Sequence, residues 1–368
     1  MAQNEPDGQD HSIPLECDAK ENPRLTVDER DERHLTTRLV QTILKPIKPA
    51  LVKAGKTDSA DPTRLKAPKS ALKRCHIEER QVEGIWVYDL TSKPEHEEEG
   101  EPSNRQPRRI IYFGGGGWQM PPSSQHFCLC AELVYRLSNT TVTIVSPPFA
   151  PKYPVSEAFP KIEDAYNALL RETALRGESV VVAGDSSGGN IALCLVLWTL
   201  LNGVEKDSKP PTAILAISPS TDLRHEHEDI KSSDKFDPIL THDAINSTAE
   251  TWCPDGSLED HPPPEMKTEE DKRDGVFDWT FGDPRVSPIQ GDLSVLVQNN
   301  VKVHGITGSY DVLEPEAVAF REKCKKEGIQ GEWLAWEGQM HCFPLAFRYG
   351  LKESKAAMDW ITDVLERT

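Results

Sequence analysis

Residues 184–188 read Gly-Asp-Ser-Ser-Gly, which matches the pattern Gly-x-Ser-x-Gly of a serine that acts as a nucleophile. The apolar run 179–183 before this motif predicts a buried strand, and the apolar run 191–201 after it predicts a helix. A tight turn between a strand and a helix strains the serine backbone and lifts the hydroxyl above the sheet edge. The pattern alone also occurs in turns that need only small residues. Its position between a strand and a helix favours a nucleophilic Ser186.

A run of four glycines, residues 114–117, follows the short apolar strand expected at residues 109–113. Acyl transfer needs N–H groups aimed at the carbonyl oxygen as it becomes an anion, and glycines let backbone N–H groups approach it closely. The sequence therefore predicts an oxyanion hole built from the N–H groups of Gly115, Gly116 and Ser187. A merely flexible loop is the alternative. The glycine spacing does not match a dinucleotide-binding loop, and the chain has no phosphate-loop lysine motif.

These two motifs and several later ones resemble the hormone-sensitive-lipase-type carboxylesterases of the α/β-hydrolase superfamily over roughly residues 80–368. The order and spacing of the motifs agree with that family as well as their residues, which makes the resemblance specific. It implies the α/β-hydrolase fold and ester hydrolysis that needs neither a metal nor an organic cofactor. The motifs are 114–118, 184–190, Ser218 and Pro219 with Asp222, 283–288, 308–311 with Glu314, and 341–343.

The resemblance assigns the rest of a catalytic triad, with Asp311 as the acid and His341 as the general base. Each follows a predicted late strand, so both should leave the sheet at the edge where Ser186 emerges. A neutral His341 would take the serine proton while Asp311 fixes its tautomer and stabilises the imidazolium. A surface histidine is the alternative for His341. Asp283 and Glu314 are the alternatives for the acid, because they lie in neighbouring motifs.

Two residues depart from the family pattern. The glycine loop of the family usually opens with a histidine that helps to brace it, and Gly114 stands there in this chain. The residue after the catalytic histidine is usually glycine and is Cys342 here. The cysteine is either an oxidisable thiol near the site or a packed side chain, and we favour the packed interpretation.

The elements that would position these residues alternate between strands and helices from about residue 73 onward. This alternation predicts an α/β fold, a mainly parallel sheet with helices on both faces. We assign residues 73–221 and 291–368 to the catalytic domain, and the charged, proline-bearing residues 222–290 to a cap insertion. Residues 25–72 show helical spacing without a strand pattern and predict a helical cap segment. Residues 1–24 predict a loose polar arm.

Within the catalytic domain, residues 82–88 alternate between apolar and polar side chains and predict a single strand. The spacing of apolar residues predicts helices over 127–137, 162–175 and 353–366.

The amino-acid composition limits the kinds of partner that the chain is expected to bind. The net charge of the 368-residue chain is −18, which repels nucleic acid and anionic lipid head groups, so we expect a neutral or cationic partner. The small-molecule ester of the predicted reaction fits this expectation. Eight cysteines show neither a disulfide framework nor zinc-binding spacing, which predicts reduced, structural thiols. No signal peptide opens the chain, and the longest apolar run is too short to span a bilayer, so we predict a cytoplasmic protein. The charged run 224–229 holds two histidines, and we interpret it as solvated surface rather than a metal site.

Five aromatic residues are candidates for the substrate pocket, although each except Trp118 fits the core better. They are Trp118, Phe127, Trp252, Phe281 and Phe343. The predicted reaction is hydrolysis of a carboxylic ester through an acyl-enzyme on Ser186. A short-to-medium acyl ester or lactone is expected, with a bulky neutral secondary metabolite or sterol as one option. A lyase, an acyl transferase and a non-catalytic small-molecule binder on the same fold are the alternatives, and a homodimer is one option for assembly.

Overall fold

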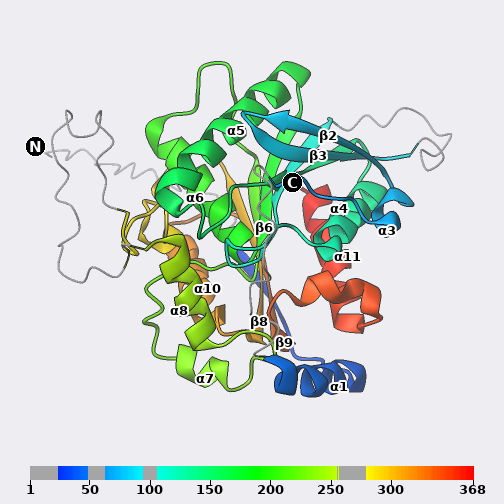
Figure 1. Cartoon of the computed structure of the whole chain (residues 1–368), viewed down its shortest axis with the longest axis vertical. Helices are drawn as coiled ribbons and strands as arrows, with labels where there is room; N and C mark the ends of the chain where they lie inside the picture. The colour runs from blue at the N-terminus through cyan, green and yellow to red at the C-terminus, as the bar shows by residue number, and fades with distance from the viewer. Residues whose placement is uncertain (1–23, 49–62, 94–105, 255, 257–278) are drawn as a thin grey trace, which may run out of the picture.

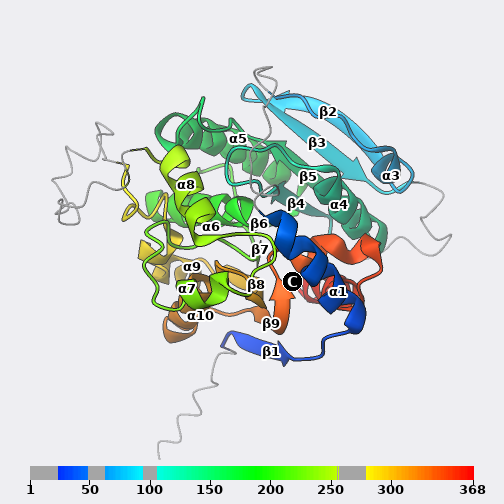
Figure 2. The same cartoon turned by 60° about the horizontal axis from the view of Figure 1, so that its bottom comes forward.

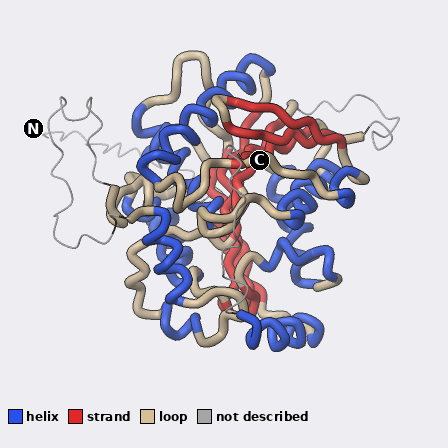
Figure 3. The backbone as a smooth tube through the Cα atoms, viewed as in Figure 1, coloured by secondary structure: helices blue, strands red, loops and turns tan. Residues whose placement is uncertain are grey.

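One sheet organises the molecule (Figures 1 and 3). The computed structural model describes residues 24–48, 63–93, 106–254, 256 and 279–368. The strands in these residues are β1 (Thr26–Arg30), β2 (His76–Val82), β3 (Ile85–Thr91), β4 (Arg108–Phe113), β5 (Thr140–Ser146), β6 (Ser179–Asp185), β7 (Ala213–Ile217), β8 (Lys302–Tyr310) and β9 (Glu332–Met340). They form a nine-stranded sheet in the order β1-β9-β8-β7-β6-β4-β5-β3-β2.

Helices cover both faces of this sheet (Figure 1). The α-helices are α1 (Leu35–Leu44), α3 (Lys69–Leu72), α4 (Ser124–Arg136), α5 (Val155–Arg176), α6 (Ser187–Asn202), α7 (Ile230–Asp234), α8 (His242–Trp252), α9 (Ser294–Gln298), α10 (Glu314–Lys326) and α11 (Lys352–Glu366). The 3-10 helices are η1 (Lys45–Ile47), η3 (Pro288–Gln290) and η4 (Phe343–Tyr349). Neighbouring strands run parallel from β1 to β5 and antiparallel from β5 through β3 to β2. The predicted mainly parallel sheet with helices on both faces is confirmed.

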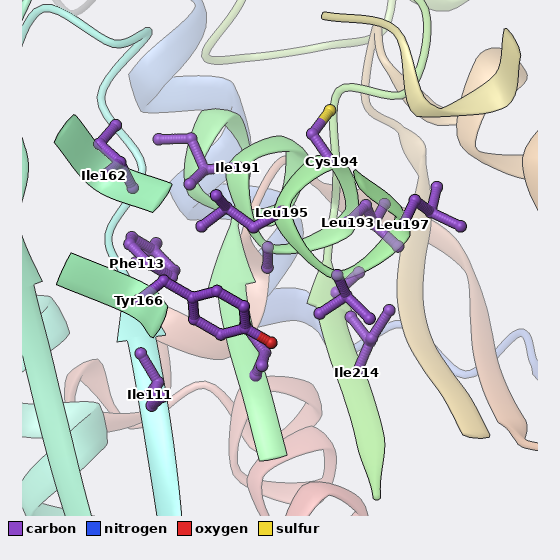
Figure 4. Close-up of a cluster of buried hydrophobic side chains, with 14 of the residues drawn as sticks. Ile111, Phe113, Ile162, Tyr166, Ile191, Leu193, Cys194, Leu195, Leu197 and Ile214 are labelled. Atoms are coloured by element: carbon purple, nitrogen blue, oxygen red, sulfur yellow. The ribbon is translucent and has the colours of Figure 1, made fainter. Parts of the chain in front are cut away.

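The centre of the sheet is built from apolar runs that are buried on both faces. All five residues of β7 are buried, as expected for a central strand of a parallel sheet. Helix α6 is apolar nearly all round because sheet and helices enclose it. Figure 4 shows Ile191 and Leu195 of α6 in one buried cluster with Phe113 of β4. This packing fixes the helix that begins directly after Ser186.

The N-terminal segment corrects one sequence prediction. Residues 25–72 were expected to lack a strand, but β1 pairs in parallel with β9 at the edge of the sheet. The N–H of Leu25 donates to the carbonyl of Ile329, 3.0 Å away, and that of Thr26 donates to the carbonyl of Gly331, also at 3.0 Å. β1 carries charged side chains and is only partly buried, so no apolar run marks it in the sequence.

Helix α1 is held beside the end of β9 (Figure 2). Gln41 Nε2 donates to the carbonyl of Gly338 at 2.8 Å, and both groups are buried. Trp336 Nε1 donates to the carbonyl of Glu32 at 2.9 Å. The N-terminal segment therefore packs against the strand that leads to His341. Of the expected helical segment, residues 49–62 lie outside the described residues, and α3 stands at its end.

Two other element boundaries differ from the sequence predictions. The strand expected at residues 82–88 is interrupted near its start, because Glu83 and Gly84 both have positive φ, 46° and 77°, and reverse the chain between β2 and β3. Residues 85–88 form the first part of β3, as expected. Helix α5 begins at Val155, earlier than the expected residue 162, and contains Pro160. Pro160 lies beyond the first turn, where a proline has no N–H to donate to the carbonyl four residues earlier.

The insertion between β7 and β8 contributes α7 and α8, which pack on one side of the molecule (Figure 1). Residues 257–278 of this insertion lie outside the described residues. Among the residues that are described, no helix is both long enough and apolar enough to cross a membrane.

Candidate active site

Ser186 lies in the sharp turn between β6 and α6. Its backbone has φ 53° and ψ −123°, a region that costs a non-glycine residue on the order of 1–3 kcal/mol. The N–H of Ser186 donates to the carbonyl of Ile217 at the end of β7, 2.9 Å away. A Cβ at Gly188 would lie 2.1 Å from the carbonyl oxygen of Phe113, so only glycine fits there. The sequence predicted this strained turn, and it leaves Ser186 partly exposed.

Asp311 and His341 come together at the carboxyl ends of the neighbouring strands β8 and β9. Asp311 Oδ2 lies 2.8 Å from His341 Nδ1, and the N–H of Leu313 donates to Asp311 Oδ1 at 2.9 Å. Both side chains are buried. Burial alone would lower the pKa of His341, but the Asp311 carboxylate outweighs it and holds that pKa well above its ordinary value. A carboxylate on Nδ1 leaves Nε2 as the nitrogen that can take a proton.

Ser186 emerges at the same edge of the sheet as this pair. The hydrogen bonds of the described residues include none between Ser186 Oγ and His341 Nε2. Contacts of this kind often form only in the complex with substrate.

The two alternative acids make other contacts. Asp283 Oδ1 accepts a hydrogen bond from Arg285 Nε at 3.0 Å. Glu314 begins α10, and burial followed by the charge of Asp311 raises its pKa to about 7. Asp311 is therefore the only one of the three carboxylates that contacts His341 in the described part of the chain.

The glycine loop corrects one predicted oxyanion donor. The N–H of Gly115 donates to Asp185 Oδ1 at 3.1 Å, so the prediction that this N–H faces the substrate oxygen is wrong for this structure. A Cβ at Gly115 would lie 2.9 Å from Ser186 Cβ, which shows how closely the loop passes the nucleophile. Within the residues described, the N–H groups of Gly116, Gly117 and Ser187 donate to no other group.

A buried carboxylate that the sequence did not single out lies beneath this loop. Asp185 Oδ1 accepts hydrogen bonds from Tyr112 Oη at 2.6 Å and from Gly115 N at 3.1 Å. Asp185 Oδ2 lies 3.2 Å from His126 Nε2 and 3.6 Å from Cys342 Sγ. Burial alone would raise the pKa of Asp185, but His126 and the hydrogen-bond donors outweigh it and lower that pKa. No motif marks His126 in the sequence, where it stands directly before the helix predicted over 127–137.

Cys342 is buried between His341 and Asp185. Its Sγ lies 3.4 Å from His341 Nε2, and its N–H donates to Ser218 Oγ at 3.1 Å. The predicted packed side chain agrees with its 9% exposure. The φ of 50° at Cys342 lies in the region that favours glycine, which is the usual family residue at this position.

Helix α8, in the insertion between β7 and β8, packs on the glycine loop. The indole rings of Trp118 and Trp252 stack with centroids 5.8 Å apart and an interplanar angle of 10°. A Cβ at Gly117 would lie 2.8 Å from Thr248 Cγ2, one turn before Trp252 on α8. Neither indole Nε1 has a hydrogen-bond partner in the described part of the structure. These two predicted pocket residues therefore lie together beside the glycine loop.

The other predicted pocket residues are not gathered there. Phe127 is 1% exposed and packs edge-on against Tyr88 in the core. Phe343 is 0% exposed and packs edge-on against Trp336. We therefore assign Phe127 of α4 and Phe343 of η4 to the core. Phe281 is partly buried at the margin of the core that holds α6.

The charged run 224–229 is not wholly solvated as expected, because His225 is buried and its Nδ1 lies 2.9 Å from Glu316 Oε2. Among the described residues, no group of three or more His, Cys, Asp or Glu side chains could hold a metal ion.

Comparisons with known proteins place these observations in a family. The family described as alpha/beta hydrolase fold matches residues 110–345. An esterase of Acinetobacter venetianus is 27% identical over 249 residues, which is 68% of this chain and 71% of that protein. Hormone-sensitive lipase of Ictidomys tridecemlineatus is 25% identical over 183 residues, which is 49% of this chain and only 22% of that lipase.

A solved structure shares the fold over nearly its whole length. The crystal structure of a hormone-sensitive lipase from a metagenome library superposes with a TM-score of 0.64 and 18% identity. The match covers 91% of this chain and 98% of that one.

Proposed function

Because the chain belongs to the α/β-hydrolase family and is a hormone-sensitive-lipase-type carboxylic ester hydrolase within it, we propose that Ser186, His341 and Asp311 form its catalytic triad. The observation that carries this proposal is the 2.8 Å contact between His341 Nδ1 and Asp311 Oδ2. It lies at the strand ends beside the strained turn that presents Ser186.

The first half of the reaction forms an acyl-enzyme. Ser186 Oγ attacks the ester carbonyl while His341 Nε2 takes its proton, and Asp311 stabilises the imidazolium that results. When the tetrahedral intermediate collapses, His341 gives the proton to the leaving alcohol and the acyl group stays on Ser186. In the second half, His341 activates a water that attacks the acyl-enzyme. The carboxylic acid leaves and Ser186 regains its proton.

The oxyanion in both halves would be held by the backbone N–H groups of Gly116, Gly117 and Ser187. These three N–H groups make no other hydrogen bond among the described residues. The N–H of Gly115 is excluded from this role because it is already bonded to Asp185. Ser187 also begins α6, and the positive end of a helix dipole favours a developing negative charge.

The proposed substrate is an uncharged ester or lactone with a short-to-medium acyl group. Support comes from the cap, where Thr248 lies on Gly117 and Trp252 stacks on Trp118 at the end of the glycine loop, which limits the space there. These apolar surfaces favour a neutral acyl or alcohol group.

The experiment that tests the triad measures release of p-nitrophenol from acetate, butyrate and octanoate esters by the wild type and by Ser186→Ala. We expect kcat of the variant to fall by about 10⁴-fold or more, because the covalent step is lost. Ser354→Ala removes a buried serine hydroxyl on α11 and serves as the matched control, with unchanged kcat. Substantial turnover by a folded Ser186→Ala variant would contradict the proposal.

Product analysis separates hydrolysis from the other reactions of the fold. An ester hydrolase yields the acid and the alcohol in equal amounts, whereas a lyase yields a product lighter than the substrate by one water. An acyl transferase diverts the acyl group to an added alcohol in preference to water.

A further inference from the structure

The buried carboxylate of Asp185 connects the turn that carries Ser186 to the glycine loop. Its Oδ1 accepts the N–H of Gly115 at 3.1 Å and the hydroxyl of Tyr112 at 2.6 Å. Its Oδ2 faces His126 Nε2 at 3.2 Å and the weak donor Cys342 Sγ at 3.6 Å. The side chain is 2% exposed, so it depends on these donors in place of water.

The orientation of the His126 ring is fixed by a hydrogen bond within α4 and its N-cap. His126 lies in the first turn of α4, where its Nδ1 accepts the N–H of Ser123 at 2.8 Å. Accepting at Nδ1 places the ring proton on Nε2, which then donates to Asp185. The ring also packs against the start of the glycine loop, since a Cβ at Gly114 would lie 3.3 Å from His126 Cγ. The His126 side chain is 8% exposed.

We propose that His126 is a positioning residue for the oxyanion hole, acting through Asp185. The imidazole holds the carboxylate at Oδ2, so that Oδ1 holds the N–H of Gly115 and fixes the next two N–H groups of the loop beside Ser186. This inference rests on the proposed function, because it assigns the next two N–H groups, those of Gly116 and Gly117, to the oxyanion.

Loss of this donor affects the transition state more than the bound substrate. Without the imidazole, Oδ2 of a buried carboxylate keeps only the thiol of Cys342, and the carboxylate must move toward another donor. Gly115 is bonded to the same carboxylate and moves with it. The oxyanion contacts tighten as the carbonyl becomes tetrahedral, so a small shift of the loop lowers kcat while KM changes little.

The experiment compares His126→Leu with His126→Gln in the full-length chain, using p-nitrophenyl butyrate. We expect His126→Leu to lower kcat by about 10–100-fold with KM within about two-fold of the wild type. Binding of a trifluoromethyl ketone, which adds to a serine hydroxyl as a tetrahedral adduct, should weaken by a similar factor. His126→Gln should recover most of both losses, because its side-chain amide can still donate to Asp185.

His304 provides the matched control. It is a buried histidine, 2% exposed, whose Nδ1 also accepts a backbone N–H, from Glu332 at 3.1 Å. It lies near the start of β8, at the opposite end of the strand from Asp311. His304→Leu should lower thermal stability and leave kcat per folded molecule unchanged.

A second variant keeps the proposal testable if the His126→Leu protein does not fold. Tyr112→Phe removes a different side-chain donor to Asp185, the hydroxyl at 2.6 Å from Oδ1, and should give a smaller loss of kcat with the same unchanged KM. The proposal is overturned if folded His126 and Tyr112 variants keep the wild-type kcat and ketone affinity, or if His126→Gln is as impaired as His126→Leu. Failure of the proposed function is separate, since it would appear as activity retained by Ser186→Ala.

Discussion

At the scale of single residues, Cys342 is the thiol closest to the proposed chemistry. Its Sγ lies 3.4 Å from His341 Nε2, which is the nitrogen that would receive the proton of Ser186. Burial raises the pKa of Cys342 to about 12, although the neighbouring His341 works in the opposite direction. A thiol reacts with electrophiles as its thiolate, and this thiol is almost entirely protonated near neutral pH.

We therefore predict that the native protein resists iodoacetamide at pH 8. With a pKa of about 12, on the order of one Cys342 side chain in 10⁴ is a thiolate at that pH. The measurement is the esterase activity that remains after an hour with excess reagent, with peptide masses to locate the label. Denatured protein, in which every thiol is accessible, provides the positive control. Rapid inactivation that is absent from Cys342→Ala would show that this thiol is reactive after all.

Sequence motifs located the proposed triad because each of its residues sits inside a short local pattern. Ser186 lies in its Gly-x-Ser-x-Gly turn, and Asp311 and His341 follow predicted strands. The donor set that we propose for the oxyanion hole differs from the one expected from the sequence, because the direction of the Gly115 N–H depends on the side chain of Asp185, 70 positions away. Likewise, nothing local indicates that His126 reaches that carboxylate from another helix.

At the scale of elements, the insertion between β7 and β8 is tied to the loop that carries Asp311, the proposed catalytic acid. Asp237 follows α7 and is 1% exposed. Its Oδ2 accepts the N–H of Val312 at 2.9 Å, and its Oδ1 accepts the N–H groups of Ile239 and Leu240 at 2.7 and 2.9 Å. Burial, followed by the nearby charge of Asp311, raises the pKa of Asp237 to about 6.

Asp237→Asn should move the acid limb of the pH–rate profile to lower pH. The Asp237 carboxylate favours the protonated imidazole of His341 above about pH 6, and the amide removes that charge. The pKa of His341 then falls, so the base becomes neutral at a lower pH. One amide oxygen also replaces two carboxylate oxygens, which should lower stability by about 1–2 kcal/mol.

The pH dependence of kcat/KM and a urea titration measure these two effects. Asp243→Asn on the exposed face of α8 is the charge-matched control and should leave the profile in place. An acid limb that stays fixed, or that moves to higher pH, would rule out an electrostatic link between Asp237 and His341.

Element prediction succeeded where apolar periodicity is strong and failed where tertiary contacts decide. The central strands and α6 are buried on all sides and read as apolar runs. The edge strand β1 has no such signal, because its charged residues pair with β9 on one side only. The hairpin between β2 and β3 was missed because its turn depends on the positive φ of Glu83, which an ordinary side chain rarely adopts.

At the scale of the whole molecule, the N-terminal segment closes onto the C-terminal helix. Glu353 on α11 is 1% exposed and accepts the N–H of His34 at 2.7 Å and the hydroxyl of Thr37 at 2.6 Å. These contacts join residues more than 300 positions apart, which no local pattern could predict. They hold α1 beside β9 and thereby cover the strand that leads to His341.

Glu353→Gln should loosen this closure in a manner that depends on pH. Burial alone would raise the pKa of Glu353, but the Thr37 hydroxyl and the His34 N–H outweigh it and lower that pKa. A depressed folded-state pKa means that the stabilisation is fully present above the pKa of the unfolded chain and is lost as the pH falls through the folded value. The variant should therefore be about 1–3 kcal/mol less stable at pH 7 and approach the wild type below pH 4.

Urea unfolding at the two pH values measures the difference, with Asp363→Asn on the exposed face of the same helix as the control. A deficit of equal size at both pH values would mean that Glu353 stabilises the closure through packing and not through its charge.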